Sequence, residues 1–336
     1  MSKRPSSMRD VARRAGVSLS TVSRVLRCAP GVAPEVRERV RRSADELSYV
    51  VSRNASGLVT GRTGRVAAVV PSLEPWFFGA VLSGVGEALH RSDLDMLVYQ
   101  VDVRDRAGSL PLPRNSDAVI TVALDLAEEE CRLLDRVGVP LVLTGQRVPG
   151  RACVFVDNRA GTAAATRHLL NLGHTRIAYI GSRTGSHISR SSRDRLAGHE
   201  SVMGEAGIRP WTVLKPSGYE GGELAVGELL SGQTLPTAVL AESDDMALGV
   251  HRALRRSGIA IPDAISLMGF GNRDVTEVLD LTTVDQAPRD IGVEAGLLTA
   301  DILEETRPFD THVELPTQII PRRSTAAPKE TRESSS

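Results

Sequence analysis

The spacing of apolar residues near the amino terminus predicts short helices joined by a turn. Ser7 and Asp10 have the spacing of a capping box, which predicts a helix beginning at Met8. Gly16 ends this helix, because a tight turn needs a positive φ or the absence of a Cβ atom. The apolar face of the helix is formed by Val11, Ala12 and Ala15.

A second helix is predicted directly after Ser18, a residue type that commonly caps helix amino termini. Its inward face holds Val22, Val25 and Leu26, and its outward face holds Leu19, Ser20, Thr21, Ser23 and Arg24. A third helix starts at Pro34 and carries outward Arg37, Arg39, Arg41 and Arg42.

Two short helices around a glycine turn indicate a helix-turn-helix. Short polar groups on its second helix can reach base edges or phosphates, and Arg24 can form a bidentate bond with guanine. A purely structural helical hairpin is the alternative.

Beyond residue 64, short apolar runs alternate with amphipathic helical patterns. The predicted strands span 65–71, 96–101, 118–122, 141–144, 177–180, 238–240 and 265–269. The helices predicted between them include 78–90, 161–172 and 246–258. Alternating strands and helices predict parallel sheets wound by right-handed crossovers, and such sheets bind ligands at the carboxyl ends of their strands.

The length of the chain and the distribution of its charge also indicate a separate amino-terminal domain. The 336 residues exceed one compact domain, so two or three domains are expected. Residues 1–62 hold 13 Lys and Arg against 5 Asp and Glu, whereas the rest of the chain holds 28 against 36. A basic head on an acidic body is the charge layout of a DNA-binding module attached to a part that avoids DNA. On charge alone, a solvated basic helix pair without a partner is equally compatible.

The rest of the composition points to the cytoplasm. Cys28, Cys131 and Cys153 lie far apart without metal-ligand spacing, so neither a disulfide framework nor a metal site is expected. No apolar run reaches the roughly 18 residues of a membrane-spanning helix, and the basic start leads into no apolar segment of a secretory signal. We therefore expect a cytoplasmic protein with no membrane partner and no cofactor.

The run MRDVARRAGVSLSTVSRVL, from Met8 to Leu26, closely resembles the DNA-binding head of the lactose/galactose repressor (LacI/GalR) family of transcriptional regulators. The resemblance implies a head over residues 1–50 that binds double-stranded operator DNA, followed by a hinge over 51–63. It also implies that bases are read by Leu19, Ser20 and Arg24, and that phosphates are contacted by Thr21 and Ser23. Repression is the expected mode of regulation, because most of the family represses.

In the family, the hinge folds on DNA and pushes a leucine into the minor groove. Ala55 and Leu58 occupy the matching positions, and an apolar wedge there would kink the duplex. Val51 and Ser52 replace the usual Pro and Asn, and Gly57 lies inside the segment, where glycine costs a helix about 1 kcal/mol relative to alanine. We expect a hinge that is disordered without DNA, and a simple linker is the alternative.

The body resembles the two-lobed core that this family shares with type I periplasmic sugar-binding proteins. The likeness is carried by segments 156–158, 168–174, 195–198, 245–249, 269–270 and 281–286. The implied core, 64–323, has one lobe of about 64–157 plus 288–310 and a second of about 158–287 plus 311–323. A small-molecule effector, sugar-like or another metabolite, would lie between the lobes. The regulator would bind a palindromic operator as a homodimer.

The resemblance also suggests where the effector is held. Trp76 and Phe77 stand where the family places aromatic or apolar contacts, and an aromatic face suits a sugar ring; core packing is the alternative. Arg195 matches a position that hydrogen-bonds ligand oxygens, and a surface ion pair with Asp194 or Glu200 is its alternative.

Two aspartates are considered as ligand contacts or as helix caps. Asp244 either lines the cleft or caps the following helix. Asp157 is interpreted as the cap of a helix beginning near Ala160 rather than as a ligand contact.

Several positions depart from the sugar-binding pattern. Gly145, Ser243 and Gly271 stand where many relatives have Asp, Asn and Asp, and each lost hydrogen bond is worth roughly 0.5–1.5 kcal/mol. We hypothesise a less hydroxylated or bulkier effector, or none. Residues 105–115 hold two prolines and no helical period, so one crossover helix is expected to be missing. The polar tail, 324–336, is expected to be disordered.

Two other classes of protein fit the residues less well. An enzyme on a doubly wound fold needs a nucleophile or a phosphate loop, and no such motif is present; His168 and His174 are interpreted as capping or packing residues. A transport-type binding protein would share the body but needs an export signal and no basic head. We therefore predict a regulator and not an enzyme.

Overall fold

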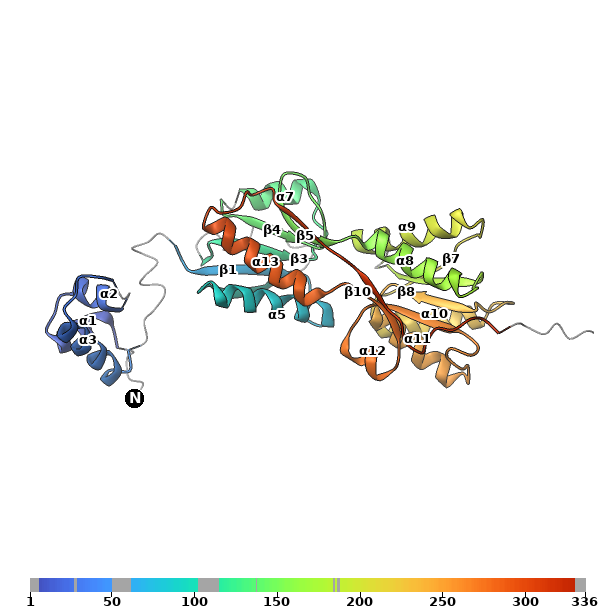
Figure 1. Cartoon of the computed structure of the whole chain (residues 1–336), viewed down its shortest axis with the longest axis horizontal. Coiled ribbons are helices and arrows are strands. Elements are labelled where there is room, and N and C mark those ends of the chain that lie inside the picture. Colours follow the sequence, from blue (N-terminus) through green and yellow to red (C-terminus); the bar gives the residue numbers. More distant parts are fainter. Residues whose placement is uncertain are drawn as a thin grey trace, which may run out of the picture. The chain divides into compact units, whose positions relative to one another are not determined.

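The computed structural model describes residues 6–26, 29–49, 62–101, 115–136, 138–183, 185 and 188–329. The chain divides into two compact units, Met1–Gly64 and Arg65–Ser336. The first contains only helices among its described residues, and the second contains two sheets with helices around them (Figure 1).

The first unit holds α1 (Met8–Ala15), α2 (Leu19–Leu26) and α3 (Pro34–Glu46). Ser7 forms the predicted capping box with Asp10, and Gly16 adopts a left-handed φ of 62° at the end of α1. The Oγ of Ser18 accepts a hydrogen bond from the backbone N–H of Thr21 at 3.1 Å, which caps α2. A small core is formed by Val11, Ala12, Ala15, Val22, Val25, Val40 and Ala44. The predicted helix-turn-helix is confirmed.

The first lobe of the second unit is built on a six-stranded sheet in the order β11-β5-β4-β3-β1-β2, and every pairing in it is parallel. The strands are β1 (Arg65–Val70), β2 (Asp95–Gln100), β3 (Ala118–Val122), β4 (Leu141–Thr144), β5 (Ala152–Val156) and β11 (His312–Leu315). One face packs against α5 (Trp76–Arg91) and α13 (Pro288–Leu303), and the other against α7 (Glu128–Asp135) (Figure 1).

The second lobe contains a sheet in the order β12-β10-β9-β8-β6-β7, in which only the β10–β12 pairing is antiparallel. The strands are β6 (Ile177–Ser182), β7 (Trp211–Lys215), β8 (Ala238–Ala241), β9 (Ser266–Gly271), β10 (Thr282–Asp285) and β12 (Gln318–Ile320). One face is covered by α8 (Asn158–Asn171) and α9 (Arg190–Glu205), and the other by α10 (Gly218–Leu230) and α11 (Asp244–Arg256). The short α12 (Asp274–Val278) follows β9. Because both faces are covered, the central strands are continuous apolar runs.

The chain passes between the lobes after β5, after β10 and after β11. The last crossing differs from expectation, because residues 311–323 were assigned entirely to the second lobe. β11 instead pairs with β5 of the first sheet, from His312 opposite Cys153 to Leu315 opposite Val156. Val313 and Leu315 pack against the first lobe's core, so the chain crosses only after Leu315 (Figure 1).

The expectation of a disordered tail from residue 324 is wrong for residues 324–329. Ser324 is buried; its Oγ donates to the carbonyl of Leu267 at 2.6 Å and accepts from the backbone N–H of Thr282 at 2.7 Å. His174 bonds the carbonyl of Ala326 through Nε2 at 2.8 Å. The polar residues of this segment suggested disorder, but in the structure Ser324 hydrogen-bonds to residues of β9 and β10.

Candidate DNA-binding and effector-binding sites

The outward face of α2 presents the residues expected to contact DNA. Leu19 is 46% exposed, Ser20 and Arg24 are exposed, and Thr21 and Ser23 are half-buried. The Oγ of Ser18 bonds the hydroxyls of Ser20 and Thr21, each at 2.8 Å. Backbone N–H groups and the positive end of the helix dipole attract anions at a helix amino terminus. This end of α2 therefore offers hydroxyls and a favourable potential to phosphates beside the apolar Leu19, and Arg24 follows in the last turn of the helix.

The arginines of α3 divide into two kinds. Arg39, Arg41 and Arg42 are exposed, and Arg42 lies 4.0 Å from Glu38 on the same helix. Arg37 is half-buried, and its Nη2 donates to the carbonyl of Ala29 at 3.1 Å. Arg37 therefore stabilises the loop before α3, and the exposed arginines supply the positive surface.

Three sequence-based predictions fall outside the described residues. Ala55 and Leu58, expected in the minor groove, lie in the interval 50–61, and most of the segment expected to lack a crossover helix lies in 102–114. Cys28 also falls outside. These remain predictions.

In the second lobe, Arg195 joins the start of α8 to the segments that follow β8 and β10. Its Nε donates to Asn158 Oδ1 at 2.8 Å, Nη1 to the carbonyl of Glu242 at 2.6 Å, and Nη2 to Gln286 Oε1 at 3.1 Å. Its guanidinium carbon lies 3.9 Å from the centre of the Phe270 ring, within range of a cation–π interaction. Burial lowers the pKa of Arg195 from its ordinary value.

These inward bonds differ from the surface ion pair considered as an alternative for Arg195. They use three of the five N–H groups of the guanidinium, and both terminal nitrogens keep a further donor for a ligand oxygen. Arg195 can therefore hold the strand ends together and also donate hydrogen bonds to a ligand.

Glu242, which sequence reasoning did not select, lies beside Arg195. It is 7% exposed, and its Oε1 accepts hydrogen bonds from the hydroxyls of Ser182 and Ser192, the second at 3.2 Å. A usable signal was present, because Glu242 lies two residues after the predicted strand 238–240, and the strand ends of a parallel sheet meet at one edge.

Asp244 is buried and engaged within the lobe. Its Oδ1 accepts from Thr283 Oγ1 at 2.6 Å, and its Oδ2 accepts from the backbone N–H of Arg273 at 2.9 Å. Burial raises its pKa. The cap of α11 is Ser243, whose Oγ accepts from the backbone N–H of Met246 at 3.3 Å. Asp244 thus fixes β10 and the loop after β9 rather than capping the helix.

The three departures from the sugar-binding pattern have local explanations. A Cβ atom on Gly271, whose φ is 146°, would lie 2.9 Å from Asp244 Oδ2, so the carboxylate of Asp244 fills that space. Gly145 has φ 83°, and its Cβ atom would lie 3.3 Å from Ala123. Ser243 is used as a helix cap. A side chain at 145 or 271 would therefore conflict with the local backbone or its contacts, whereas at 243 the helix cap is a role that serine fills.

Trp76 and Phe77 are the first residues of α5, directly beyond the carboxyl end of β1. Both are half-buried. Phe77 packs against the first lobe's core and meets Phe78 edge to face, with ring centres 5.6 Å apart. Phe77 thus has the contacts of a core residue, and Trp76 is the better placed of the two to offer a ring face to a ligand.

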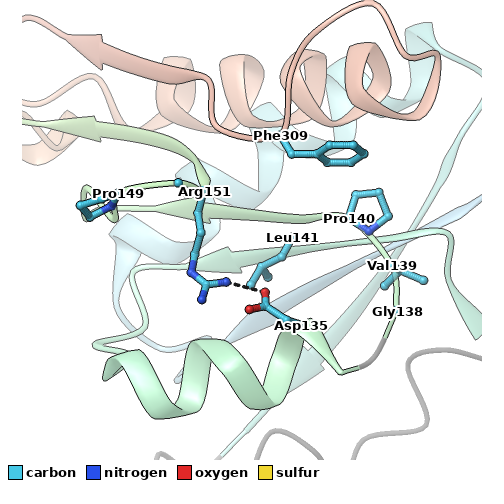
Figure 2. A pocket seen from close by; sticks show the side chains of 9 residues that line it. Asp135, Gly138, Val139, Pro140, Leu141, Pro149, Arg151 and Phe309 are labelled. Atoms are coloured by element: carbon cyan, nitrogen blue, oxygen red, sulfur yellow. Dashed lines mark hydrogen bonds and ion pairs between the residues drawn. The ribbon is translucent and has the colours of Figure 1, made fainter.

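Two cavities lie away from this cluster. One of about 510 Å³ lies where β4, β5 and β11 begin, the opposite edge of the first sheet, between Val139, Pro140, Pro149 and Phe309 (Figure 2). Its wall includes the ion pair of Arg151 with Asp135. Another, of about 660 Å³, lies between α10, α11 and α12 and is lined by Tyr219, Leu248, His251, Arg252, Arg255, Arg256, Arg273, Val275 and Leu279.

Over the residues that the structure describes, no group of three or more His, Cys, Asp or Glu side chains is arranged to hold a metal ion. Within the same residues, every helix is too short or too polar to cross a membrane.

Comparison with known proteins gives matches over nearly the whole chain. Residues 7–52 match bacterial regulatory proteins of the lacI family, and residues 166–325 match a periplasmic binding protein-like domain. The chain is 33% identical over 334 residues to the HTH-type transcriptional regulator GalR of Escherichia coli (strain K12), covering 96% of each protein.

Two solved structures are similar over their full length. The transcriptional regulator CelR in complex with cellobiose gives a TM-score of 0.71 at 29% identity and covers 95% of this chain and 100% of that one. The lac repressor dimer bound to operator and the anti-inducer ONPF gives a TM-score of 0.87 at 24% identity and covers 96% and 100%.

Proposed function

The chain belongs to the lacI family of bacterial transcriptional regulators, and we propose that it represses genes by binding a palindromic operator as a homodimer under the control of a small-molecule effector. The observation that carries the proposal is the capped, outward-facing α2, with Leu19 and Arg24 exposed on it. The regulator acts in the cytoplasm, where its DNA is.

On the operator, α2 lies in the major groove of each half-site. Leu19, Ser20 and Arg24 contact bases, and Thr21 and Ser23 contact phosphates. The exposure of Leu19 supports this assignment, because a leucine on a helix surface gains by contact with an apolar group such as a thymine methyl. Ala55 and Leu58 enter the minor groove at the centre of the site.

The homodimer is supported by apolar residues exposed around α10, α11 and α12. Val278 is 81% exposed, Leu224 49% and Tyr219 47%. Tyr219 also lines the cavity between the same helices, and a two-fold axis would bring this surface against its own copy. The lac repressor structure, which has a similar fold, is a dimer on its operator.

The effector lies at the carboxyl ends of the strands, between the two lobes. Trp76 offers a ring face from the first lobe, and Arg195 offers donors from the second. Phe77 and Asp244 contribute indirectly. Phe77 packs against the first lobe's core, and Asp244 accepts hydrogen bonds from Thr283 and from the backbone of Arg273. The small or engaged side chains at 145, 243 and 271 favour a ligand with fewer hydroxyls, or a bulkier one, than a simple hexose.

Selection of bound fragments from genomic DNA by the full-length protein tests this function. We expect enrichment of fragments that share an inverted repeat, and loss of one preferred guanine in each half-site for Arg24→Ala. Enrichment no greater than that of random duplex, with and without candidate metabolites, would overturn the proposal.

A further inference from the structure

Pro30, in the described part of the segment before α3, holds the guanidinium of Arg24. Arg24 Nη2 donates a hydrogen bond to the carbonyl of Pro30 at 2.8 Å. Ala29, the residue before Pro30, is itself held from both helices: its backbone N–H donates to the carbonyl of Arg24 at 2.9 Å, and Arg37 Nη2 donates to its carbonyl at 3.1 Å. The hydrogen bonds that link Ala29 to both α2 and α3 therefore set the position of the Pro30 carbonyl.

Gly31, the next residue, fits this arrangement for two separate reasons. Its φ is 82°, a left-handed conformation that residues with a Cβ atom rarely adopt. A Cβ atom on Gly31 would also lie 3.0 Å from Arg24 Nη2. The guanidinium thus rests beside the bare Cα of Gly31 while it bonds the carbonyl of Pro30, and a side chain at residue 31 would push it aside.

We infer that Pro30 and Gly31 form a clamp that positions Arg24 for reading guanine, and that Gly31 is therefore a positioning residue that affects specificity through Arg24. The inference rests on the proposed function. An arginine on a helix surface samples many rotamers, and a fixed contact reduces the entropy lost when it binds. The bond to Pro30 uses one N–H of Nη2, so the second N–H of Nη2 and those of Nη1 stay available for the two acceptors of guanine.

The clamp makes a prediction that separates it from a merely structural turn. Gly31→Asn tests the Cβ atom, because asparagine tolerates a left-handed backbone better than most residues. Gly31→Ala adds backbone strain to the same contact. Gly16→Ala is the matched control: Gly16 lies in the same unit with φ 62°, but nothing lies within 4 Å of its Cβ position.

The experiment selects bound sequences from a random duplex library with the full-length wild type, these three variants, Arg24→Ala and Pro30→Ala. Circular dichroism verifies that each variant is folded. Where Arg24→Ala abolishes the preference for one guanine, we expect Gly31→Asn and Gly31→Ala to reduce that preference by about fivefold or more, leaving other positions unchanged. Gly16→Ala and Pro30→Ala, which keeps the carbonyl, should retain the wild-type preference.

The outcomes are distinguishable. If Arg24→Ala loses the guanine but both Gly31 variants select it as strongly as the wild type, the clamp is overturned and the base-reading role of Arg24 stands. The clamp is also overturned if the Gly31 variants select that guanine more strongly, since the loop would then restrain Arg24. If Arg24→Ala selects the wild-type sequence, both the clamp and the proposed reading of guanine fail.

Discussion

The carboxylate of Asp125 in the first lobe accepts a hydrogen bond from the backbone N–H of Arg190 in the second lobe, at 3.0 Å. Arg190 is the first residue of α9, so a carboxylate from one lobe adds to the helix cap that Ser189 provides in the other. The same carboxylate lies 3.7 Å from Arg190 Nε and 3.7 Å from Arg193 Nη2. Asp125 thus links the two lobes at the strand ends, where an effector would enter.

Replacing Asp125 should make the lobes open more readily. A carboxylate at a helix amino terminus contributes roughly 1 kcal/mol, and exposed ion pairs add less, so Asp125→Ala should shift an open–closed equilibrium by about fivefold. Small-angle X-ray scattering should show a larger radius of gyration. Asp301→Ala is the control, because Asp301 pairs with Arg307 inside one lobe. Equal radii for the wild type and Asp125→Ala would contradict the link.

Arg195 should be needed for stability as well as for effector binding. Arg195→Ala removes three hydrogen bonds and leaves Asn158 and Gln286 with unpaired buried groups. We expect urea denaturation to show a loss of about 3–5 kcal/mol, because breaking buried charge-assisted bonds has that cost. Arg167→Ala, which removes an exposed pair with Glu205, should change stability by less than about 1 kcal/mol. A similar loss in both variants would refute a special role for Arg195.

His199 should make the protein less stable in mild acid. It is fully buried, bonds Thr166 Oγ1 through Nδ1 at 3.1 Å and stacks on Tyr179. Burial lowers the pKa of His199 from 6.5 to about 4. Between pH 6.5 and 4 the unfolded chain takes up a proton that the native state does not, so stability decreases as pH falls through this window, by about 3 kcal/mol in total.

The matched comparison is His199→Phe, which keeps a ring beside Tyr179 but cannot titrate. Its free energy of unfolding, measured in urea at several pH values, should depend less on pH between 6.5 and 4 than that of the wild type. An unchanged slope in His199→Phe would show that other groups cause the acid sensitivity.

The contact between α5 and α13 should tolerate no side chain at Gly292. A Cβ atom there would lie 2.0 Å from the carbonyl oxygen of Val81, and one on Gly84 would lie 2.0 Å from the carbonyl oxygen of Arg289. Gly292→Ala should therefore cost about 2–3 kcal/mol, seen as a lower urea midpoint. Gly79→Ala, on α5 with nothing within 4 Å of its Cβ position, should gain about 0.5–1 kcal/mol. If Gly292→Ala and Gly79→Ala changed the stability equally, α5 and α13 would have to move apart at little cost in free energy.

The dimer surface can be tested at Val278, which is 81% exposed. Val278→Asp should convert a dimer into a monomer in sedimentation velocity, because a buried unpaired carboxylate destabilises an interface. Leu235→Asp places the same charge on an exposed leucine before β8, beyond α10, and should leave the dimer intact. A dimer that survives Val278→Asp would place the interface elsewhere.

The amino-terminal unit and the α/β class were predictable because their signals are local. The Ser7–Asp10 box, the turn at Gly16 and the caps at Ser18 and Asp157 each depend on residues within three or four positions, and each forms as expected. Trp76 shows the limit of such signals: α5 begins at this residue, two positions before the predicted start.

Contacts between distant segments were decided by the tertiary structure alone. Arg195 meets residues 158, 242 and 286, and β11 pairs with β5 across more than 150 positions. Ser324 is buried only because β9 and β10 present partners to it. By itself the sequence determined the amino-terminal helix caps, the seven strands with clear apolar runs and the family, since these depend on neighbouring residues; it did not reveal β5, β7, β10, β11 or β12. Strand order, the burial of Asp244 and Glu242, and the link from Asp125 to Arg190 depend on which distant elements pack together, and periodicity carries no such information.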